Sequence, residues 1–175
     1  MCVPKSANIT KVCGKTYIKG QKPNLFVSHI DEVTAIPAAD ADSLTISSAV
    51  TFRSAVTGPP AIPAGQWWKW QCSKVDGSYS ATPEGDADNP TIKVSVEAFI
   101  YGITAGRTYT IGQTLGHEYL VVACDNEGNN RLIGELGRGA TITVTEQTAD
   151  KNGYKVLITW ETGSYPYFYT AALPN

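Results

Sequence analysis

Two stretches of the chain alternate between apolar and polar residues. From Thr91 to Ile100, every second residue is apolar, beginning with Ile92, and the residues between them are hydroxylic or charged for most of the run. The stretch from Leu44 to Arg53 follows a similar pattern. A period of two places one set of side chains on a core and the other in water. The sequence therefore predicts two long strands whose wet faces carry Thr45, Ser47, Thr51, Arg53, Lys93, Ser95 and Glu97.

Further strands are predicted along most of the remaining chain. They cover residues 25–30, 67–72, 79–82, 119–124 and 131–134, and a hairpin formed by residues 140–147 and 154–162. The run from Tyr119 to Cys124 is continuously apolar, which is typical of a strand covered on both faces. In the hairpin, Lys151-Asn152-Gly153 is expected to supply the positive-φ residues of a tight connection.

Only residues 105–116 suggest a helix, with Tyr109, Ile111 and Leu115 along one side and Gly116 as a stop signal. Strands predominate and regular helix is scarce. The predicted fold class is all-β, an antiparallel β-sandwich or barrel with one short flanking α-helix, an N-terminal arm and a long inter-strand loop.

The long loop covers residues 54–66. Three prolines and two glycines exclude regular ladder pairing there, and no charge occurs between Arg53 and Lys69. Such a loop either packs on its own domain or docks on a neighbouring subunit. The candidate subunit-interface residues are Val56, Pro59, Pro60, Ile62, Pro63 and Trp67. Trp68 and Trp70 share a parity with Cys72 and are expected in the core, whereas Trp67 is expected to be exposed or covered by a neighbour.

The chain of 175 residues is long enough to bury a core without disulfides or a structural metal. Residues 1–24 are interpreted as an N-terminal arm that either pairs as a strand or frays. Residues 25–162 are interpreted as the β-domain, and residues 163–175 as an aromatic C-terminal tail. Cys72 and Cys124 lie in apolar strand patterns, where buried free thiols are expected.

The charge distribution and the lack of known motifs argue against several classes of function. The formal net charge is −2 with the two signs mixed along the chain, unlike the concentrated basic footprint of nucleic-acid-binding domains. No apolar run approaches the roughly 18 residues of a membrane span. His29 and His117 lack metal-ligand neighbours, and the Asp86, Asp88 and Asn89 cluster lacks the glycine of a calcium loop. No catalytic or cofactor motif is present, so neither an enzyme nor a cofactor is predicted.

The order of these features resembles the tail tube proteins of long-tailed bacteriophages and their contractile-system relatives. The similarity covers residues 40–162: a strand, a long loop, the strand beginning at Trp67, an acidic loop, the strand 91–100, a helix, and a closing hairpin around residues 150–154. The resemblance implies six copies in a ring, rings stacked into a tube, and an inner barrel to which each copy contributes strands. The long loop and the terminal arm would contact the next subunit or ring.

The same resemblance implies partners and a location. The chain would bind itself and the tape-measure, tail terminator and baseplate or connector proteins, with transient non-specific contact to genomic DNA and no membrane contact. It would be assembled in the bacterial host cytoplasm and reside in the virion tail. A wet face of small hydroxyls suits a lumen, because strong phosphate contacts would retard DNA.

Two other functions stay open at this point. One is another virion component, such as a capsid decoration or connector protein. The other is a carbohydrate-binding β-sandwich that uses Trp67, Trp68 and Trp70 as a stacking platform.

Overall fold

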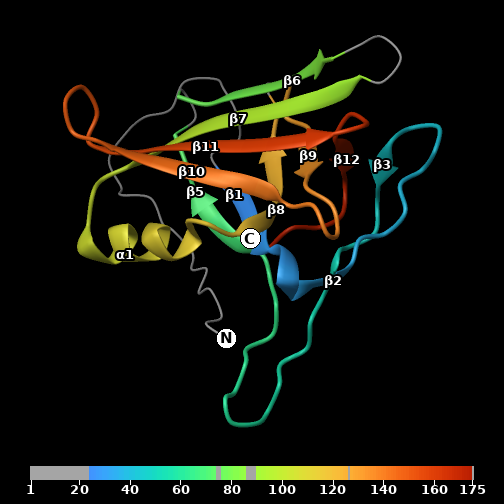
Figure 1. The fold of residues 1–175 in the computed structure, drawn as a ribbon, viewed down its shortest axis with the longest axis horizontal. Coiled ribbons are helices and arrows are strands. Elements are labelled where there is room, and N and C mark those ends of the chain that lie inside the picture. Colours follow the sequence, from blue (N-terminus) through green and yellow to red (C-terminus); the bar gives the residue numbers. More distant parts are fainter. Residues whose placement is uncertain (1–23, 74–75, 86–89, 126, 175) are drawn as a thin grey trace.

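The structure is a computed structural model that describes residues 24–73, 76–85, 90–125 and 127–174. The all-β prediction is confirmed, with one α-helix in these residues (Figure 1). The strands are β1 Asn24–His29, β2 Val33–Ala35, β3 Thr45–Ile46, β4 Thr51–Phe52, β5 Trp68–Gln71, β6 Ser78–Glu84, β7 Thr91–Tyr101, β8 Glu118–Cys124, β9 Asn130–Ile133, β10 Ala140–Gln147, β11 Gly153–Thr162 and β12 Tyr167–Tyr169. A 3-10 turn, η1 Ile30–Glu32, joins β1 to β2, and α1 Ala105–Thr114 precedes β8.

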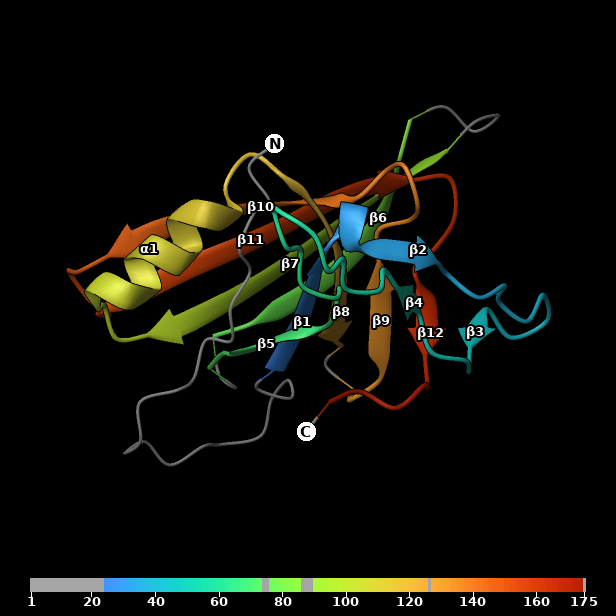
Figure 2. The same ribbon diagram turned by 90° about the horizontal axis from the view of Figure 1, so that it is seen from below.

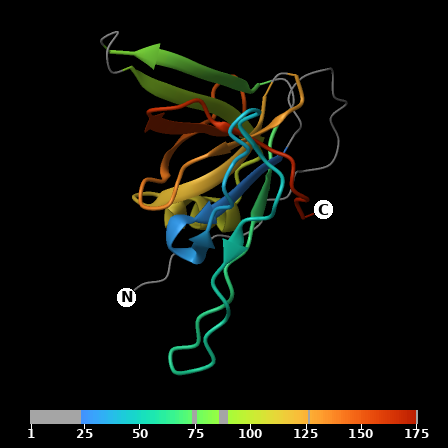
Figure 3. The same cartoon turned by 90° about the vertical axis from the view of Figure 1, so that its right-hand side faces the viewer.

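One strongly curled sheet contains ten of the strands. Its pairing runs β6-β7-β11-β10-β8-β1-β5, and β9, β12 and β3 extend a branch from β8. Every pairing in this sheet is antiparallel except β12 with β3, which is parallel. β2 and β4 form a separate two-stranded sheet. Figure 3 shows the main sheet curving around its own concave side, as in half of a barrel.

The concave side holds the first of two apolar cores. β7 and β11 pair over ten consecutive positions, from Gly153 opposite Tyr101 to Thr162 opposite Ile92. The alternation predicted for β7 is confirmed, since Ile92, Val94 and Val96 are buried while Lys93 is exposed. The first core consists of Leu25, Val27, Trp70, Cys72, Ile92, Val94, Val96, Ala98, Ile100, Ile111, Tyr119, Val121, Ala123, Ile133, Ala140, Ile142, Tyr154, Val156, Ile158 and Trp160.

β8 separates this core from a second one. Tyr119, Val121 and Ala123 belong to the first core, whereas Leu120 and Val122 belong to the second. The prediction of a strand covered on both faces is therefore confirmed. β8 contacts β1 along one edge and both β9 and β10 along the other, so it lies at the centre of the pairing.

Irregular chain covers the second core. It consists of Phe26, Val33, Ile46, Val50, Trp67, Leu120, Val122, Leu132, Tyr169 and Ala171. The side chains of Trp67 and Tyr169 meet edge to face, with ring centroids 6.2 Å apart. The Tyr169 hydroxyl accepts a hydrogen bond of 3.2 Å from the Val50 amide. Residues far apart in the sequence thus close this core with few ladder bonds.

The C-terminal segment is part of the sheet. β12 pairs with β9 on one side and β3 on the other. Arg131 of β9 holds it in place: its guanidinium lies 3.4 Å from the centroid of the Phe168 ring, and its Nη1 donates to the Pro166 carbonyl at 3.4 Å. The Asp125 carboxylate accepts from Arg131 Nε at 3.2 Å. The sequence assigned these residues to a separate tail, but Tyr167–Tyr169 complete the second core.

The predicted strand from Leu44 to Arg53 is wrong. The segment instead contains two strands of two residues each, β3 and β4, which belong to different sheets. Leu44 has φ 51°, outside the extended region, and β3 finds its partner in the distant β12. The apolar periodicity came from Ile46 and Val50, which both enter the second core, Ile46 from β3 and Val50 from the irregular chain between β3 and β4.

Gly153 has a different role from the one predicted. The only described non-glycine residue with positive φ is Leu44, and Gly153 is not among the positive-φ glycines, so Lys151-Asn152-Gly153 supplies no left-handed residue. A Cβ at Gly153 would lie 2.2 Å from the Ile100 carbonyl oxygen and 2.7 Å from the Phe99 ring. Close approach of β11 to β7 therefore requires glycine here.

The predicted helix is confirmed with slightly different bounds. α1 begins after Thr104, whose hydroxyl accepts from the Arg107 amide at 3.3 Å. The expected apolar side is wrong, because Ile111 enters the first core while Tyr109 and Leu115 are 65% and 47% exposed.

Candidate assembly surfaces

The convex surface of β6, β7, β11 and β10 is polar. We call it the outer face; it comprises Ser78, Ser80, Thr82, Glu84, Thr91, Lys93, Ser95, Glu97, Lys155, Leu157, Thr159, Glu161, Thr141, Thr143 and Thr145. The ladder places Ser80 opposite Ser95, Ser95 opposite Thr159, and Thr159 opposite Thr141. One row of hydroxyls therefore crosses four strands, because residues in register project from the same side of a sheet.

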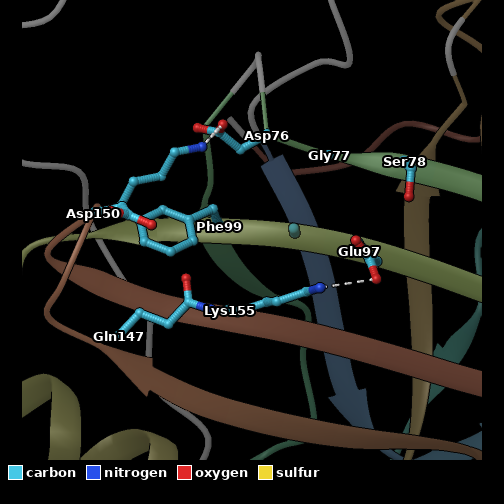
Figure 4. A pocket seen from close by; sticks show the side chains of 10 residues that line it. Asp76, Gly77, Ser78, Glu97, Phe99, Gln147, Asp150 and Lys155 are labelled. Carbon is cyan, nitrogen blue, oxygen red and sulfur yellow. Dashed lines mark hydrogen bonds and ion pairs between the residues drawn. The ribbon is translucent and has the colours of Figure 1, made fainter.

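Lysines on the outer face lie against carboxylates of adjacent strands. Lys155 Nζ on β11 is 3.1 Å from Glu97 Oε1 on β7, as Figure 4 shows. Lys93 Nζ on β7 is 3.8 Å from Glu84 Oε2 on β6, and Glu161 lies opposite Lys93 in the β11 register. Both ion pairs cross between strands, so the sheet register determines them.

A shallow pocket of about 380 Å³ lies at one end of the outer face (Figure 4). At its rim, the Asp76 carboxylate accepts hydrogen bonds from Ser73 Oγ at 2.9 Å and Tyr101 Oη at 2.8 Å, and it pairs with Lys151 Nζ. Burial alone would raise the pKa of Asp76, but these donors outweigh burial and lower it. The same hydrogen bond, together with burial, raises the pKa of Tyr101. The carboxylate therefore ties the loop after β5 to β7 and to the β10–β11 connection.

A second hollow, of about 330 Å³, lies at the opposite end of the face. Arg138, Glu118 and Glu161 contribute charged side chains to its lining. The Glu118 carboxylate accepts from the Gly139 amide at 3.0 Å, which fixes the turn before β10. Gly137 adopts φ 81° in this turn, which is closed by the bridge between Glu135 and Arg138.

The long loop projects from the body. In Figure 3, the chain between β4 and β5 extends well beyond the sheet. Val56 and Ile62 exchange two backbone hydrogen bonds, of 2.9 and 3.1 Å, which hold its two arms together. Val56 is 48% exposed, Pro59, Pro60 and Pro63 are exposed, and Ile62 is half-buried. This exposure favours the alternative in which the loop docks on a neighbouring subunit, and that docking stays a prediction.

The root of this loop is tightly built. The Arg53 amide donates to the Glu32 carbonyl at 2.8 Å, and the Gly65 amide donates to the Arg53 carbonyl at 2.9 Å. A Cβ at Gly65 would lie 2.7 Å from the Glu32 carbonyl oxygen, so the root of the loop packs closely against η1. The loop is therefore fixed at its base while its tip is free of intramolecular packing.

Two titratable side chains are buried beside this root. The His29 ring stacks edge to face on His117 with centroids 5.1 Å apart, and its Nδ1 accepts from the Asp31 amide at 3.2 Å. Burial lowers the pKa of His29 and outweighs the opposing charge of Asp31. Burial raises the pKa of Glu32, although the Gln66 amide and the charge of Arg53 act in the opposite direction.

The tryptophans do not form a sugar-binding platform. Trp67 is 8% exposed and packs against Phe52 and Tyr169, which corrects the prediction that it is exposed or covered by a neighbour. Trp70 is fully buried in the first core and Trp68 is half-buried. The carbohydrate-binding alternative thereby loses the residues on which it was based.

The seven predicted wet-face residues separate into two groups. Lys93, Ser95 and Glu97 share the outer face. Thr45, Ser47, Thr51 and Arg53 lie on or beside β3 and β4, which do not belong to that four-stranded region. Arg53 contacts the long loop instead, through a hydrogen bond of 3.2 Å from Nη2 to the Pro63 carbonyl.

Sequence reasoning missed most of the outer face. Ser78, Ser80 and Thr82 of β6 and the threonines of β10 join it through pairing with β7 and β11. Their signal was present as alternation of Thr141, Thr143 and Thr145 with apolar residues. The face could have been assembled from the sequence only with the strand order β6-β7-β11-β10 in hand.

Other candidate sites are sparse. Within the described ranges, no group of three or more His, Cys, Asp or Glu residues could hold a metal ion. The Asp86, Asp88 and Asn89 cluster lies outside the described residues. Cys72 and Cys124 are free and buried, as predicted, and burial raises the pKa of Cys72 to about 12. No helix in the described part of the chain is long and apolar enough to cross a membrane.

Comparisons of this chain with protein-family models, with curated proteins and with solved structures found no match.

Proposed function

We propose that this chain is a structural virion protein that self-assembles, most simply as stacked and closed rings that form a phage tail tube for DNA. The observation that carries the proposal is the outer face: a broad, hydroxyl-rich and charge-paired sheet surface with no catalytic group on it. Such a surface suits the wall of a conduit, because hydroxyls are hydrated and do not compete for phosphates as free lysines do.

The edges of the same sheet support a head-to-tail interface. In the described residues, β6 pairs only with β7, so its other edge carries unpaired backbone groups. Unpaired edges favour pairing with another chain, and Ser78–Thr82 carry no charge to oppose it. Pro83 confines the usable edge to the first part of β6.

The receiving end of the neighbour is the end formed by β10 and α1. β10 pairs with β8 only at Ala140 and Thr141, and α1 lies beside the remainder (Figure 2). Four antiparallel strands make β6 and β10 run in opposite directions, so β6 of one copy meets β10 of the next in antiparallel alignment. A head-to-tail contact of this kind closes into a ring when its rotation divides a full turn.

The projecting loop supplies a second contact. It is uncharged, and Val56 and the prolines at its tip are exposed. Because its root is fixed by Glu32, Arg53 and Gly65, the loop is held away from the body at a defined position. A preorganised apolar projection loses little conformational entropy on docking. We assign it to the contact between neighbouring copies.

Electron microscopy of the purified protein tests the proposal directly. We expect negative-stain images to show rings or tubes with an open channel. These assemblies should become longer or more numerous as the protein concentration rises. A monomer that stays dispersed across concentrations and salt conditions would rule out self-assembly.

Deletion of Thr57 to Ala64 tests the loop. The Arg53–Gly65 hydrogen bond already brings the two ends of the excursion together, so the shortened chain can close with the body unchanged. We expect a folded monomer, by circular dichroism and thermal melting, that no longer polymerises. Normal tubes from the deletion variant would remove the loop from the interface.

A further inference from the structure

The lysines of the outer face are neutralised by carboxylates. Lys155 lies 3.1 Å from Glu97 and Lys93 lies 3.8 Å from Glu84, each pair joining adjacent strands. At the end of the face, Lys151 pairs with Asp76 (Figure 4). Arg138, at the border of the face, lines a hollow together with Lys93 and two carboxylates, Glu118 and Glu161.

These surface pairs have little to do with stability. The side chains of Lys155 and Glu97 are 43% and 42% exposed, and those of Lys93 and Glu84 are 47% and 57% exposed. Exposed ion pairs contribute about 0–1 kcal/mol, because water screens them and two long side chains must be ordered. The carboxylates can therefore be replaced with little effect on the fold, which separates their electrostatic effect from folding.

We infer that Glu84 and Glu97 determine how the outer face responds to a polyanion: by neutralising Lys93 and Lys155, they keep the face from binding nucleic acid. A lysine released from its carboxylate can contact a phosphate and release a counterion, and each such contact strengthens binding. The hydroxyl row between the two pairs, from Ser80 to Thr141, adds no charge. The face thus tolerates a polyanion beside it without retaining it.

The biological purpose of this inference rests on the proposed conduit. The binding of nucleic acid to the outer face, however, can be measured on unassembled protein. Nucleic acid that moves along a wall must not be held by it, and paired charges meet this requirement while keeping the wall hydrated. A wholly apolar wall would aggregate, and a wall with free lysines would bind phosphate.

The test measures binding of a labelled 20-base-pair DNA duplex at low salt by fluorescence anisotropy. The double variant Glu84→Gln/Glu97→Gln is expected to bind, whereas the unaltered protein does not. Glu161 still lies opposite Lys93 in this variant, so the value for two fully released lysines, a slope of log K against log salt of about −1.8, is the upper limit. At that limit, a tenfold rise in salt weakens binding about 60-fold. Of the two single substitutions, Glu97→Gln is expected to give the larger part of that slope, because Glu84→Gln leaves Lys93 opposite Glu161.

A matched control separates local from global charge. The variant Asp42→Asn/Glu127→Gln makes the same change in net charge at exposed turn positions outside the four strands of the face, and it should not bind. Adding Lys93→Gln and Lys155→Gln to the double variant should abolish binding again. Equal binding by the turn variant, or no binding by a folded double variant, would overturn the inference. Because the duplex is titrated against unassembled protein, failure to form tubes would leave this result interpretable.

Discussion

The two cores on either side of β8 are built in different ways. The first lies inside the curled sheet, where β7 and β11 alternate regularly over ten paired positions. The second is closed by β3, β12 and irregular chain, with contacts such as Val50 to Tyr169 across 119 residues. Regular ladders place side chains by register, whereas the second core depends on a few aromatic contacts formed at long range. We therefore expect the first core to tolerate backbone shifts less well than the second. Substitutions in the first core should lower the free energy of unfolding more.

Truncating one tryptophan in each core is the strongest test of this comparison. Trp70→Ala in the first core is expected to lower the free energy of unfolding by about 4 kcal/mol, because a fully buried indole leaves a large cavity. Trp67→Ala in the second core should cost about 3 kcal/mol, since the irregular chain around it can partly collapse. Urea unfolding measures both values.

Limited proteolysis shows which part of the chain is destabilised in each tryptophan variant. Trp67→Ala should expose residues 36–66 to cleavage while the far-ultraviolet circular dichroism of the sheet persists. If both variants unfold in one transition with the same protease pattern, the two cores form a single cooperative unit and the distinction is wrong.

Glycines at close backbone contacts provide a second comparison of the two regions, with smaller expected changes in stability. Gly153→Ala would place Cβ 2.2 Å from the Ile100 carbonyl oxygen in the first region, and is expected to cost about 3 kcal/mol. Gly65→Ala makes a similar contact, 2.7 Å from the Glu32 carbonyl oxygen, but in irregular chain that can shift, so we expect about 1 kcal/mol. Thermal melting provides the measurement.

Gly163→Ala is the matched control, because a Cβ at this position would meet no heavy atom within 4 Å and the φ of Gly163 is not positive. It should melt like the unaltered protein. A Gly65→Ala variant less stable than Gly153→Ala would show that the loop root is more rigid than the ladder.

The smallest expected effect concerns pH. His29 ends β1 at the boundary of the two regions, and burial lowers its pKa from 6.5. On acidification, the unfolded chain binds a proton first, so stability is lost as the pH falls through 6.5 toward the folded-state pKa. His29→Gln should remove this loss. The urea midpoint of each protein, measured from pH 7.5 to 5.5, gives the difference.

The raised pKa of Glu32 has the opposite sign, since the folded state binds its proton first. Its contribution is common to both proteins and cancels in the difference between them. His117→Gln, at an exposed position against the same ring, serves as the control. An unchanged pH dependence in His29→Gln would mean that His29 is not the group that titrates.

The sequence predicted the strands around the first core better than the chain around the second core. Alternation identified β7, β10 and β11, and the continuous run from Tyr119 to Cys124 identified a strand buried on both faces. These predictions needed only local periodicity. The assignment of Leu44–Arg53 failed because Ile46 and Val50 are buried by β12 and Tyr169, partners more than 100 residues away. No local pattern carries that information.

The candidate surfaces show the same limit. Lys93, Ser95 and Glu97 were predicted together because they alternate on one strand, and the structure keeps them on one face. Their neighbours across the sheet could not be named, since strand order is decided by tertiary packing. The loop was recognised from its prolines and lack of charge, and its docking stays a prediction. Trp67 was misplaced because parity along β5 does not tell which of two cores lies on each side.

The central position of β8 has a consequence for synthesis of the chain. β8 pairs with β1, which lies about ninety residues earlier in the sequence. β3 pairs with β12, which lies more than 100 residues later. Such high contact order slows folding, because loop-closure entropy is lost before the long-range contacts form. A nascent chain on the ribosome therefore cannot complete its second core until β12 and Ala171 have emerged.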